Sequence, residues 1–248
     1  MSVALHDTVG WTLHEAEEIL RPLDLRPETR PDDFARKTLE IRGNQHQMQS
    51  LGWTDGRGML NGKYCRLQSK KVDIAILMIY PTSRPDLIPV FVAEWVVVGG
   101  QCRIAVLDVH PAGNDPVLER ELAGVFGTIG ERWQRQLPTA PDSPEWFRKI
   151  AKPWAIFSDC TIDRVGVLRE AYREYLHTVV NLFYRPRQSL CEGGAEAESV
   201  VRYKRHGFEH TPGRAILRTT FGVEYAEGLL RWHFGPPNHA MQQTGATL

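Results

Sequence analysis

The sequence lacks the features that mark membrane, secreted and nucleic-acid-binding proteins. No apolar run in its 248 residues approaches the roughly 20 residues that a membrane-spanning helix needs. The amino terminus has neither the basic start nor the apolar core of a signal peptide. Basic and acidic residues balance at 30 each, which argues against nucleic-acid binding by general electrostatics. We therefore expect a cytoplasmic protein without a membrane or nucleic-acid partner.

Motifs for bound metals and cofactors are also missing. The four cysteines, Cys65, Cys102, Cys160 and Cys191, are scattered singly without a Cys-x-x-Cys pair, so neither an iron–sulfur cluster nor a structural zinc site is expected. No glycine-rich phosphate loop occurs, which weakens the case for a bound nucleotide or flavin. We expect no bound metal or cofactor. A redox enzyme of this kind would take its electrons from outside.

The order of the segments predicts the fold class. Strand patterns dominate the first half of the chain and helical periodicity the second. Strands are expected at 37–42, 64–67, 72–80, 89–98 and 102–108, and a return strand or extended arm at 154–162. Residues 45–52 are open between strand and loop, and 82–87 are expected to be a loop. Helices are expected at 12–20, 116–136, 144–150, 165–183, 196–206 and, interrupted, within 212–234. A capping box at Thr12 and Glu15 is expected to open the first helix, and Gly207 to stop the helix at 196–206.

This order predicts one domain over residues 1–235, followed by a disordered tail at 236–248. The domain is expected to be a mixed α/β (α+β) fold. Its architecture is expected to be a three-layer α/β/α sandwich with a central antiparallel sheet.

The central hairpin carries one conspicuous carboxylate. Residues 89–98 are almost all β-branched, aromatic or small and apolar, Gly99-Gly100 provides a turn, and a second strand follows. Glu94 has no polar neighbour for four residues on either side. A carboxylate in such a strand must be paired, protonated or at the floor of a cleft, because burial of a bare charge is unfavourable. Burial would raise the pKa of Glu94 toward the range of proton transfer near neutral pH.

The hairpin register leaves two alternatives open. With a two-residue turn, Glu94 faces Ala105 and lies diagonal to Arg103, which indicates a salt bridge. With a three-residue turn, Glu94 faces Val106 and lies diagonal to Asp108, which places two carboxylates on one face. Asp108 could also simply cap the end of its strand. The pattern does not fix the register.

The histidines near the carboxyl terminus are ambiguous. His206 and His210 are four residues apart, a spacing that suits a metal on one helix, but Gly207 lies between them and no third ligand motif is near. We therefore expect both histidines to lie on the surface and not to bind a metal. The same segment holds a basic cluster formed by Arg202, Lys204, Arg205 and His206. This cluster is either a solvated helix face or a docking site for an acidic partner.

Several segments resemble the ferredoxin-dependent bilin reductases and their relatives, the red chlorophyll catabolite reductases. In the hairpin, Pro89-x-Phe91 leads into Glu94, and Asp108-Val109-His110-Pro111 follows. Further matching segments are Val72 to Pro81, Pro153-Trp154, Ile156-Phe157-Ser158, and the series Tyr203, Arg214, Leu217, Phe221-Gly222, Ala226 and Phe234. The resemblance covers roughly residues 60–235.

The resemblance implies a function. Members of this family have an α/β/α sandwich and bind a linear tetrapyrrole between the sheet and the C-terminal helices. They reduce it by successive single-electron transfers from ferredoxin, an acidic and transient partner, without a metal or flavin of their own. Glu94 stands at the position of the central acid of the family and is expected to donate protons. The sequence-level alternatives are a tetrapyrrole carrier without catalysis and a reductase of a non-bilin substrate.

The chain also departs from the family pattern. Most bilin reductases have aspartate where this chain has Glu94, a substitution similar to the chlorophyll catabolite reductases. The histidine of some members corresponds to Ile76, and an aspartate near the C-terminal arginine corresponds to Thr211, with His210 beside it. We therefore expect Glu94 as the buried proton donor, with Asp108 or His210 as a second catalytic group. We expect Arg214 to pair with substrate propionates, and Ser158 and Arg103 as further substrate-binding residues.

Overall fold

A computed structural model describes residues 7–55, 60–82, 89–112, 116–137, 140, 143–184 and 198–235. Its centre is an eight-stranded sheet in which all pairs of neighbouring strands are antiparallel. The strand order is β1-β3-β4-β5-β6-β7-β8, and β2 pairs with β3. The strands are β1 (Leu25–Pro27), β2 (Arg36–Ile41), β3 (Asn44–Asp55), β4 (Leu60–Ser69), β5 (Val72–Pro81), β6 (Val90–Val98), β7 (Gln101–His110) and β8 (Ile156–Cys160).

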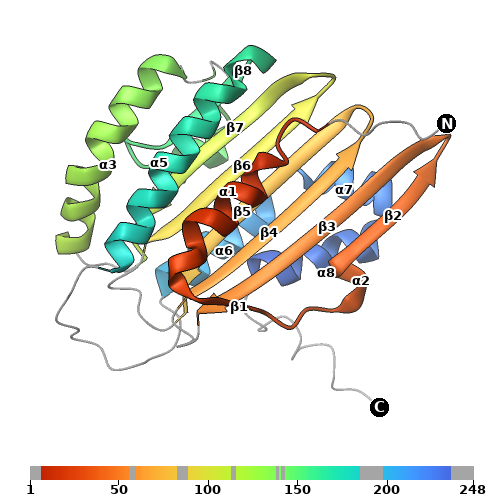
Figure 1. The fold of residues 1–248 in the computed structure, drawn as a ribbon, viewed down its shortest axis with the longest axis horizontal. Helices are drawn as coiled ribbons and strands as arrows, with labels where there is room; N and C mark the ends of the chain where they lie inside the picture. Colours follow the sequence, from red (N-terminus) through yellow and green to blue (C-terminus); the bar gives the residue numbers. More distant parts are fainter. Residues whose placement is uncertain are drawn as a thin grey trace.

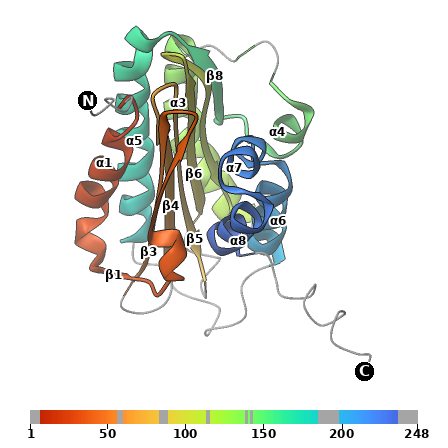
Figure 2. The same ribbon diagram turned by 90° about the vertical axis from the view of Figure 1, so that its right-hand side faces the viewer.

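Helices cover both faces of this sheet. Helices α1, α3 and α5 lie against one face, and α4, α6, α7 and α8 lie against the other, as the edge-on view shows (Figures 1 and 2). The helical elements are α1 (Trp11–Leu20), η1 (Arg21–Leu23), α2 (Asp32–Ala35), α3 (Pro116–Gln136), α4 (Glu145–Ile150), η2 (Ile162–Arg164), α5 (Val165–Phe183), α6 (Glu198–His210), α7 (Arg214–Phe221) and α8 (Val223–Phe234). The expected three-layer α/β/α sandwich is confirmed.

Two hydrophobic cores result, one on each side of the sheet. On β6, Phe91 and Trp95 point toward α5, and their ring centroids each lie 6.1 Å from that of Tyr172. The alternate residues Val92 and Val96 belong to the core beneath α6, α7 and α8. Because side chains alternate along a strand, a strand buried on both faces is apolar throughout. This explains the continuous apolar run around Glu94.

Two expectations about helix ends are wrong. The first helix begins at Trp11, and Thr12 lies inside it without forming a side-chain cap. Glu15 does not turn back to the helix start, because its carboxylate is buried and pairs with Arg169 and Arg173 of α5. The helix expected to stop at Gly207 continues as α6 to His210.

Gly207 serves close packing instead of helix termination. A Cβ at this position would lie 2.6 Å from Cε1 of Phe234, so glycine lets α8 approach α6. The segment 45–52, left open between strand and loop, forms part of β3. The expected loop at 82–87 lies beyond Thr82 outside the described residues, as do the expected tail at 236–248 and the first residues of the helix expected at 196–206.

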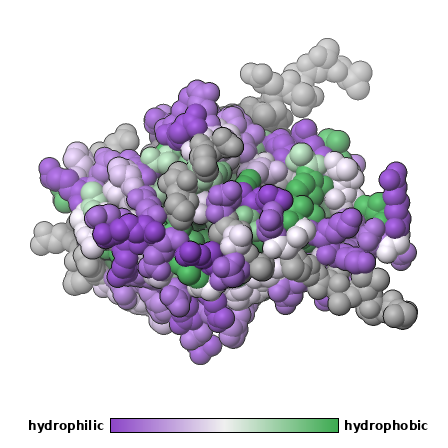
Figure 3. Space-filling view, turned by 90° about the horizontal axis from the view of Figure 1, so that it is seen from above, coloured by the Kyte–Doolittle hydropathy of each residue, from purple (hydrophilic) through white to green (hydrophobic). Residues whose placement is uncertain are grey.

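The surface of the molecule is mixed in character. Seen from above, hydrophilic side chains alternate with separate small hydrophobic patches (Figure 3). Within the part of the chain that the structure describes, none of the helices has the length and apolar composition of a membrane span.

Candidate active site

The register of the central hairpin brings two carboxylates to one face. Gly99 and Gly100, with φ of +60° and +78°, form a two-residue turn in which Val98 pairs with Gln101. A bulge then follows, because Val97 pairs with Cys102 but Val96 pairs with Ile104. Arg103 is the additional residue. Glu94 therefore faces Val106, as expected for a three-residue turn, although the turn has two residues.

Glu94 is buried without a partner. Its side chain lies under the C-terminal helices and is 6% exposed. No hydrogen bond or ion pair to this carboxylate occurs among the residues that the structure describes. Burial raises the pKa of Glu94 from its ordinary value of 4.5 to about 8, because the charged form loses its hydration without gaining a cation. At neutral pH the group is therefore a protonated acid that can give up its proton.

Two cavities meet at Glu94, between the sheet and the C-terminal helices. One extends over β3, β4 and β5 beneath α7 and α8, and the other extends over β7 beneath α4 and α6. Their free volumes are about 30 Å³ and about 40 Å³. Both are lined by Glu94, Ile76, Thr211 and Phe234. The site is thus an elongated space across the sheet with an unpaired acid at its middle.

A second acid lies at the β7 end of this space. Asp108 is opposite Val92 and diagonal to Glu94, which corresponds to a Cα separation of about 7–8 Å. Oδ2 of Asp108 lies 2.7 Å from Nε2 of His110, close enough for an ion pair although the ring is not oriented for a hydrogen bond. The hydroxyl of Tyr203 donates a long hydrogen bond of 3.5 Å to the same oxygen.

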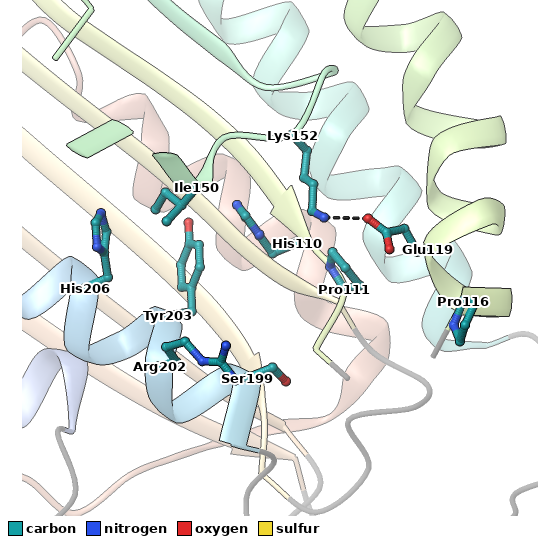
Figure 4. A pocket seen from close by; sticks show the side chains of 10 residues that line it. All are labelled: His110, Pro111, Pro116, Glu119, Ile150, Lys152, Ser199, Arg202, Tyr203 and His206. Atoms are coloured by element: carbon teal, nitrogen blue, oxygen red, sulfur yellow. Dashed lines mark hydrogen bonds and ion pairs between the residues drawn. The ribbon is translucent and has the colours of Figure 1, made fainter. Parts of the chain in front are cut away.

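His110 and Tyr203 connect this acid to an open cleft. Their ring centroids are 4.5 Å apart, and both side chains line a larger cavity of about 470 Å³ between α3, α4 and α6. Figure 4 shows them side by side, with Lys152 and Glu119 paired at 2.6 Å on the opposite wall. Tyr203 also lines the inner cavity that Asp108 and Glu94 share. The acids are therefore buried, and Tyr203 lines both their cavity and the open cleft.

A cysteine and a histidine lie at the other end of the inner space. Sγ of Cys65 on β4 is 3.2 Å from Nδ1 of His233 on α8, and both side chains line the cavity with Glu94. Both are buried, His233 to 1% exposed. Burial, and to a lesser degree the charge of Lys63, lowers the pKa of His233 to about 3. The ring is thus neutral at physiological pH.

Only some of the expected site residues lie together in the structure. Glu94 and Asp108 share one cavity, whereas His210 is exposed and its ring stacks on Trp146. Arg214 pairs with Glu227 of α8 at 2.9 Å. His210 and Arg214 are not among the residues that line the two cavities, and their expected roles stay predictions.

The other two expected substrate-binding residues also lie away from Glu94. Ser158 pairs with Ala105, which places it on the sheet face covered by α3 and α5. Arg103, the bulge residue, lines a separate surface cavity with Asp159. It does not form the salt bridge with Glu94 that the first hairpin register would have produced. The substrate-binding roles of Ser158 and Arg103 remain untested predictions.

Sequence reasoning gave no role to four residues of the site, namely His110, Tyr203, Cys65 and His233, although His110 and Tyr203 lie in the segments that carry the resemblance. The alternation of Asp108 and His110 on one strand could have indicated a shared face. No local signal points to Cys65 and His233, which lie 168 residues apart in the chain. In the described part of the chain, no group of three or more His, Cys, Asp or Glu side chains is placed to hold a metal ion.

Comparison with known proteins decides the family. The family model described as ferredoxin-dependent bilin reductase matches residues 13–232. The chain belongs to the ferredoxin-dependent bilin reductase family. Two relatives, the phycoerythrobilin:ferredoxin oxidoreductases of Prochlorococcus marinus strains NATL1A and NATL2A, are each 25% identical over 174 residues, which is 67% of both chains. The resemblance noted from the hairpin and the C-terminal segment is confirmed.

The fold of this bilin reductase also has a solved counterpart. The crystal structure of phytochromobilin synthase from tomato, in complex with biliverdin, superimposes with a TM-score of 0.75. The match covers 92% of this chain and 83% of the tomato chain at 19% sequence identity. As a member of the family, the protein is an enzyme that reduces a bilin with electrons from ferredoxin.

Proposed function

We propose that the bilin binds between strands β3 to β7 of the sheet and helices α6, α7 and α8, which cover one face of these strands. We propose that Glu94 donates protons to it. One observation carries this proposal. Glu94 is a buried acid without a cation at the junction of two cavities, and its pKa is raised to about 8. Structural carboxylates rarely remain buried in this state, whereas proton donors need a pKa near the working pH.

The chemistry requires such a group. Reduction of one double bond of a bilin consumes two electrons and two protons, and ferredoxin supplies only the electrons. Each electron that arrives makes the bilin more basic, so a neutral carboxylic acid beside it can transfer its proton at that moment. The carboxylate that remains is unpaired and buried, which favours its reprotonation. We propose that electrons pass directly from ferredoxin to the bilin, with no bound cofactor between them.

Asp108 is the second proposed acid. It lies diagonal to Glu94 in the same cavity, and its contacts with His110 and Tyr203 lead toward the open cleft. This placement suits the return of protons from solvent to the site. His210, exposed and stacked on Trp146, is less well placed for this role.

Binding requires the site to expand. The cavities beside Glu94 hold about 30 Å³ and 40 Å³, whereas pockets for ligands of this size are usually about 300–1,000 Å³. The layer formed by α6, α7 and α8 is the part that must move, because α7 is short and packs mainly on α8. We propose that the bilin enters by displacing this layer from the sheet.

We propose that the acidic surface of ferredoxin docks on helix α6. Arg202 and Arg205 of this helix are exposed, and Arg202 lines the open cleft. The basic cluster expected from sequence is only partly on the surface, because Lys204 is 5% exposed and lies 4.1 Å above the ring centroid of Tyr80. Complementary charge on this face would speed the encounter of the two proteins.

Absorption spectroscopy tests the proposal. Protein purified without added metal or flavin is mixed with biliverdin, and ferredoxin with a reducing system is then added. We expect a shifted spectrum of the bound pigment that converts to reduced products. Glu94→Gln should still bind the pigment but convert it about 10²–10⁴-fold more slowly, because a positioned acid contributes this much to proton transfer.

The matched control is Glu119→Gln, the same change at a carboxylate of the open cleft. This variant should convert biliverdin at close to the normal rate. Equal rates for wild type and Glu94→Gln would contradict the role of Glu94. Binding without conversion by the wild type would indicate a carrier, and no spectral change would indicate a different substrate.

A further inference from the structure

The pair formed by Cys65 and His233 is a second polar feature of the inner space. Its residues come from opposite layers, β4 in the sheet and α8 in the helical layer. Nδ1 of His233 contacts Sγ of Cys65 at 3.2 Å. Nε2 of the same ring is buried and has no hydrogen-bond partner within the described ranges of the chain. A buried polar atom without a partner, in the wall of a cavity, indicates that a bound ligand supplies the missing hydrogen-bond partner.

The chemistry of the pair fixes the position of the ring proton. Burial raises the pKa of the Cys65 thiol, so the sulfur keeps its hydrogen. Thiol sulfur is a weak acceptor, whereas a bare imidazole nitrogen is a good one, so the S–H group donates to Nδ1. The neutral ring then carries its proton on Nε2. His233 therefore presents a fixed, uncharged N–H donor.

The sheet register places this donor relative to Glu94. Cys65 pairs with Ile76, and Ile76 pairs with Glu94, so the three residues form one row across adjacent strands. Two strand spacings correspond to about 10 Å between Cys65 and Glu94. His233 packs over the Cys65 end of this row. The donor and the acid thus face one elongated space from positions that a single linear tetrapyrrole can span.

The surroundings select the kind of acceptor. Nearly all other side chains that line this cavity are apolar, among them Met48, Leu67 and Leu229. Lys63, whose charge acts on His233, is paired with Glu28 and lies 4.2 Å above the ring centroid of Trp232. A carboxylate would be poorly compensated here, whereas a neutral carbonyl suits a neutral donor. In a linear tetrapyrrole, the neutral carbonyl groups are the lactam oxygens of the two terminal rings.

We propose that Nε2–H of His233, held in this tautomer by Cys65, binds the lactam oxygen of one terminal ring of the bilin. The contact would fix which part of the conjugated chain lies above Glu94. His233 is thus a substrate-binding residue and Cys65 a positioning residue. This inference rests on the proposed function, since it places the bilin in the same space.

The tautomer can be measured in protein without pigment. Nitrogen-15 NMR of histidine-labelled protein should show a ring with a bare Nδ1 and a protonated Nε2, unchanged between about pH 5 and about pH 9. The assignment follows from the loss of this signal in His233→Gln. In Cys65→Ala the ring should exchange between tautomers, and in Cys65→Ser the hydroxyl should preserve the single form. A proton on Nδ1 in the wild type, or titration near pH 6.5, would overturn the inference.

A matched pair of variants tests the contact with the pigment. His233→Gln places an amide N–H close to the position of Nε2, whereas His233→Asn places one close to that of Nδ1. We expect His233→Gln to bind biliverdin nearly as tightly as the wild type, and His233→Asn about tenfold more weakly. Circular dichroism and thermal melting verify that both variants are folded.

The outcomes separate this inference from the proposed function. Equal biliverdin affinity of the two variants, with normal reduction by the wild type, would contradict the role of His233 alone. If the wild type neither binds nor reduces biliverdin, the proposed function fails. In that case the NMR result still decides whether Cys65 fixes the tautomer.

Discussion

Two carboxylates buried in neighbouring strands of the same sheet have opposite environments. Asp73 on β5 is 0% exposed and Glu94 on β6 is 6% exposed. Asp73 accepts hydrogen bonds from Nε and Nη2 of Arg66 at 2.8 and 2.9 Å, and from the backbone N–H groups of Thr8 and Val9. Glu94 has none of these. Asp73 lies on the face of α1 and α5, and Glu94 lies on the face of the C-terminal helices.

The difference separates a structural carboxylate from a functional one. A buried carboxylate that accepts hydrogen bonds from a guanidinium and from backbone N–H groups connects elements, here the amino-terminal segment and the sheet. Glu15, paired with Arg169 and Arg173 of α5, is a second case on the same face. A buried carboxylate without donors instead keeps its proton and can deliver it. Burial is the same in both cases, and the partners decide the role.

The largest expected effect is a loss of protein stability when Asp73, the paired carboxylate, is removed. Asp73→Ala removes the buried partner of the Arg66 guanidinium, which keeps only the exposed Asp7, and leaves two backbone N–H groups without their acceptor. We expect the free energy of unfolding to fall by about 3 kcal/mol, measured by urea denaturation. Asp73→Asn, which keeps an oxygen acceptor, should lose less. A change within about 0.5 kcal/mol for Asp73→Ala would mean that the pair does not hold the fold.

The unpaired site is expected to make stability depend on pH, with a smaller change for each pH unit. The pKa of Glu94 is about 8 in the folded protein and ordinarily 4.5. Between these values the folded protein keeps a proton that the unfolded chain has released, so stability falls as the pH rises. The slope is at most about 1.4 kcal/mol per pH unit. Glu94→Gln should remove this contribution, so that the variant becomes more stable relative to the wild type toward pH 8.

The comparison of urea unfolding curves across this pH range checks the sign. Stability curves for wild type and Glu94→Gln that run parallel between pH 4.5 and 8 would show that Glu94 has no raised pKa. The same series on Asp73→Asn serves as the control, since that variant leaves the Glu94 contribution in place.

Most of the fold was predictable because its signals are local. Alternation and β-branched residues mark the strands, helical periodicity marks α3 and α5, and Gly99-Gly100 marks the hairpin. Local signals failed where a side chain had a distant partner. Glu15 resembles a capping residue but pairs with α5, and Gly207 resembles a helix stop but makes room for Phe234.

Among the residues that line the site, only the two acids could be predicted from the sequence. Glu94 and Asp108 stand out because charged residues are rare in a buried strand, but their shared face depends on a bulge at Arg103 that no sequence pattern signals. Cys65 and His233 meet only through the packing of α8 on the sheet. Contacts between residues so far apart in the chain follow from the tertiary structure and not from local preference.

Infrared spectroscopy of Glu94 is the most direct test of its role. The difference spectrum between wild type and Glu94→Gln should contain the C=O band of a protonated carboxylic acid at about pH 7. On titration, this band should give way to carboxylate bands with a midpoint near pH 8. If the band is already absent at about pH 7, Glu94 is ionised in the folded protein, and its proposed role as the resting proton donor is wrong.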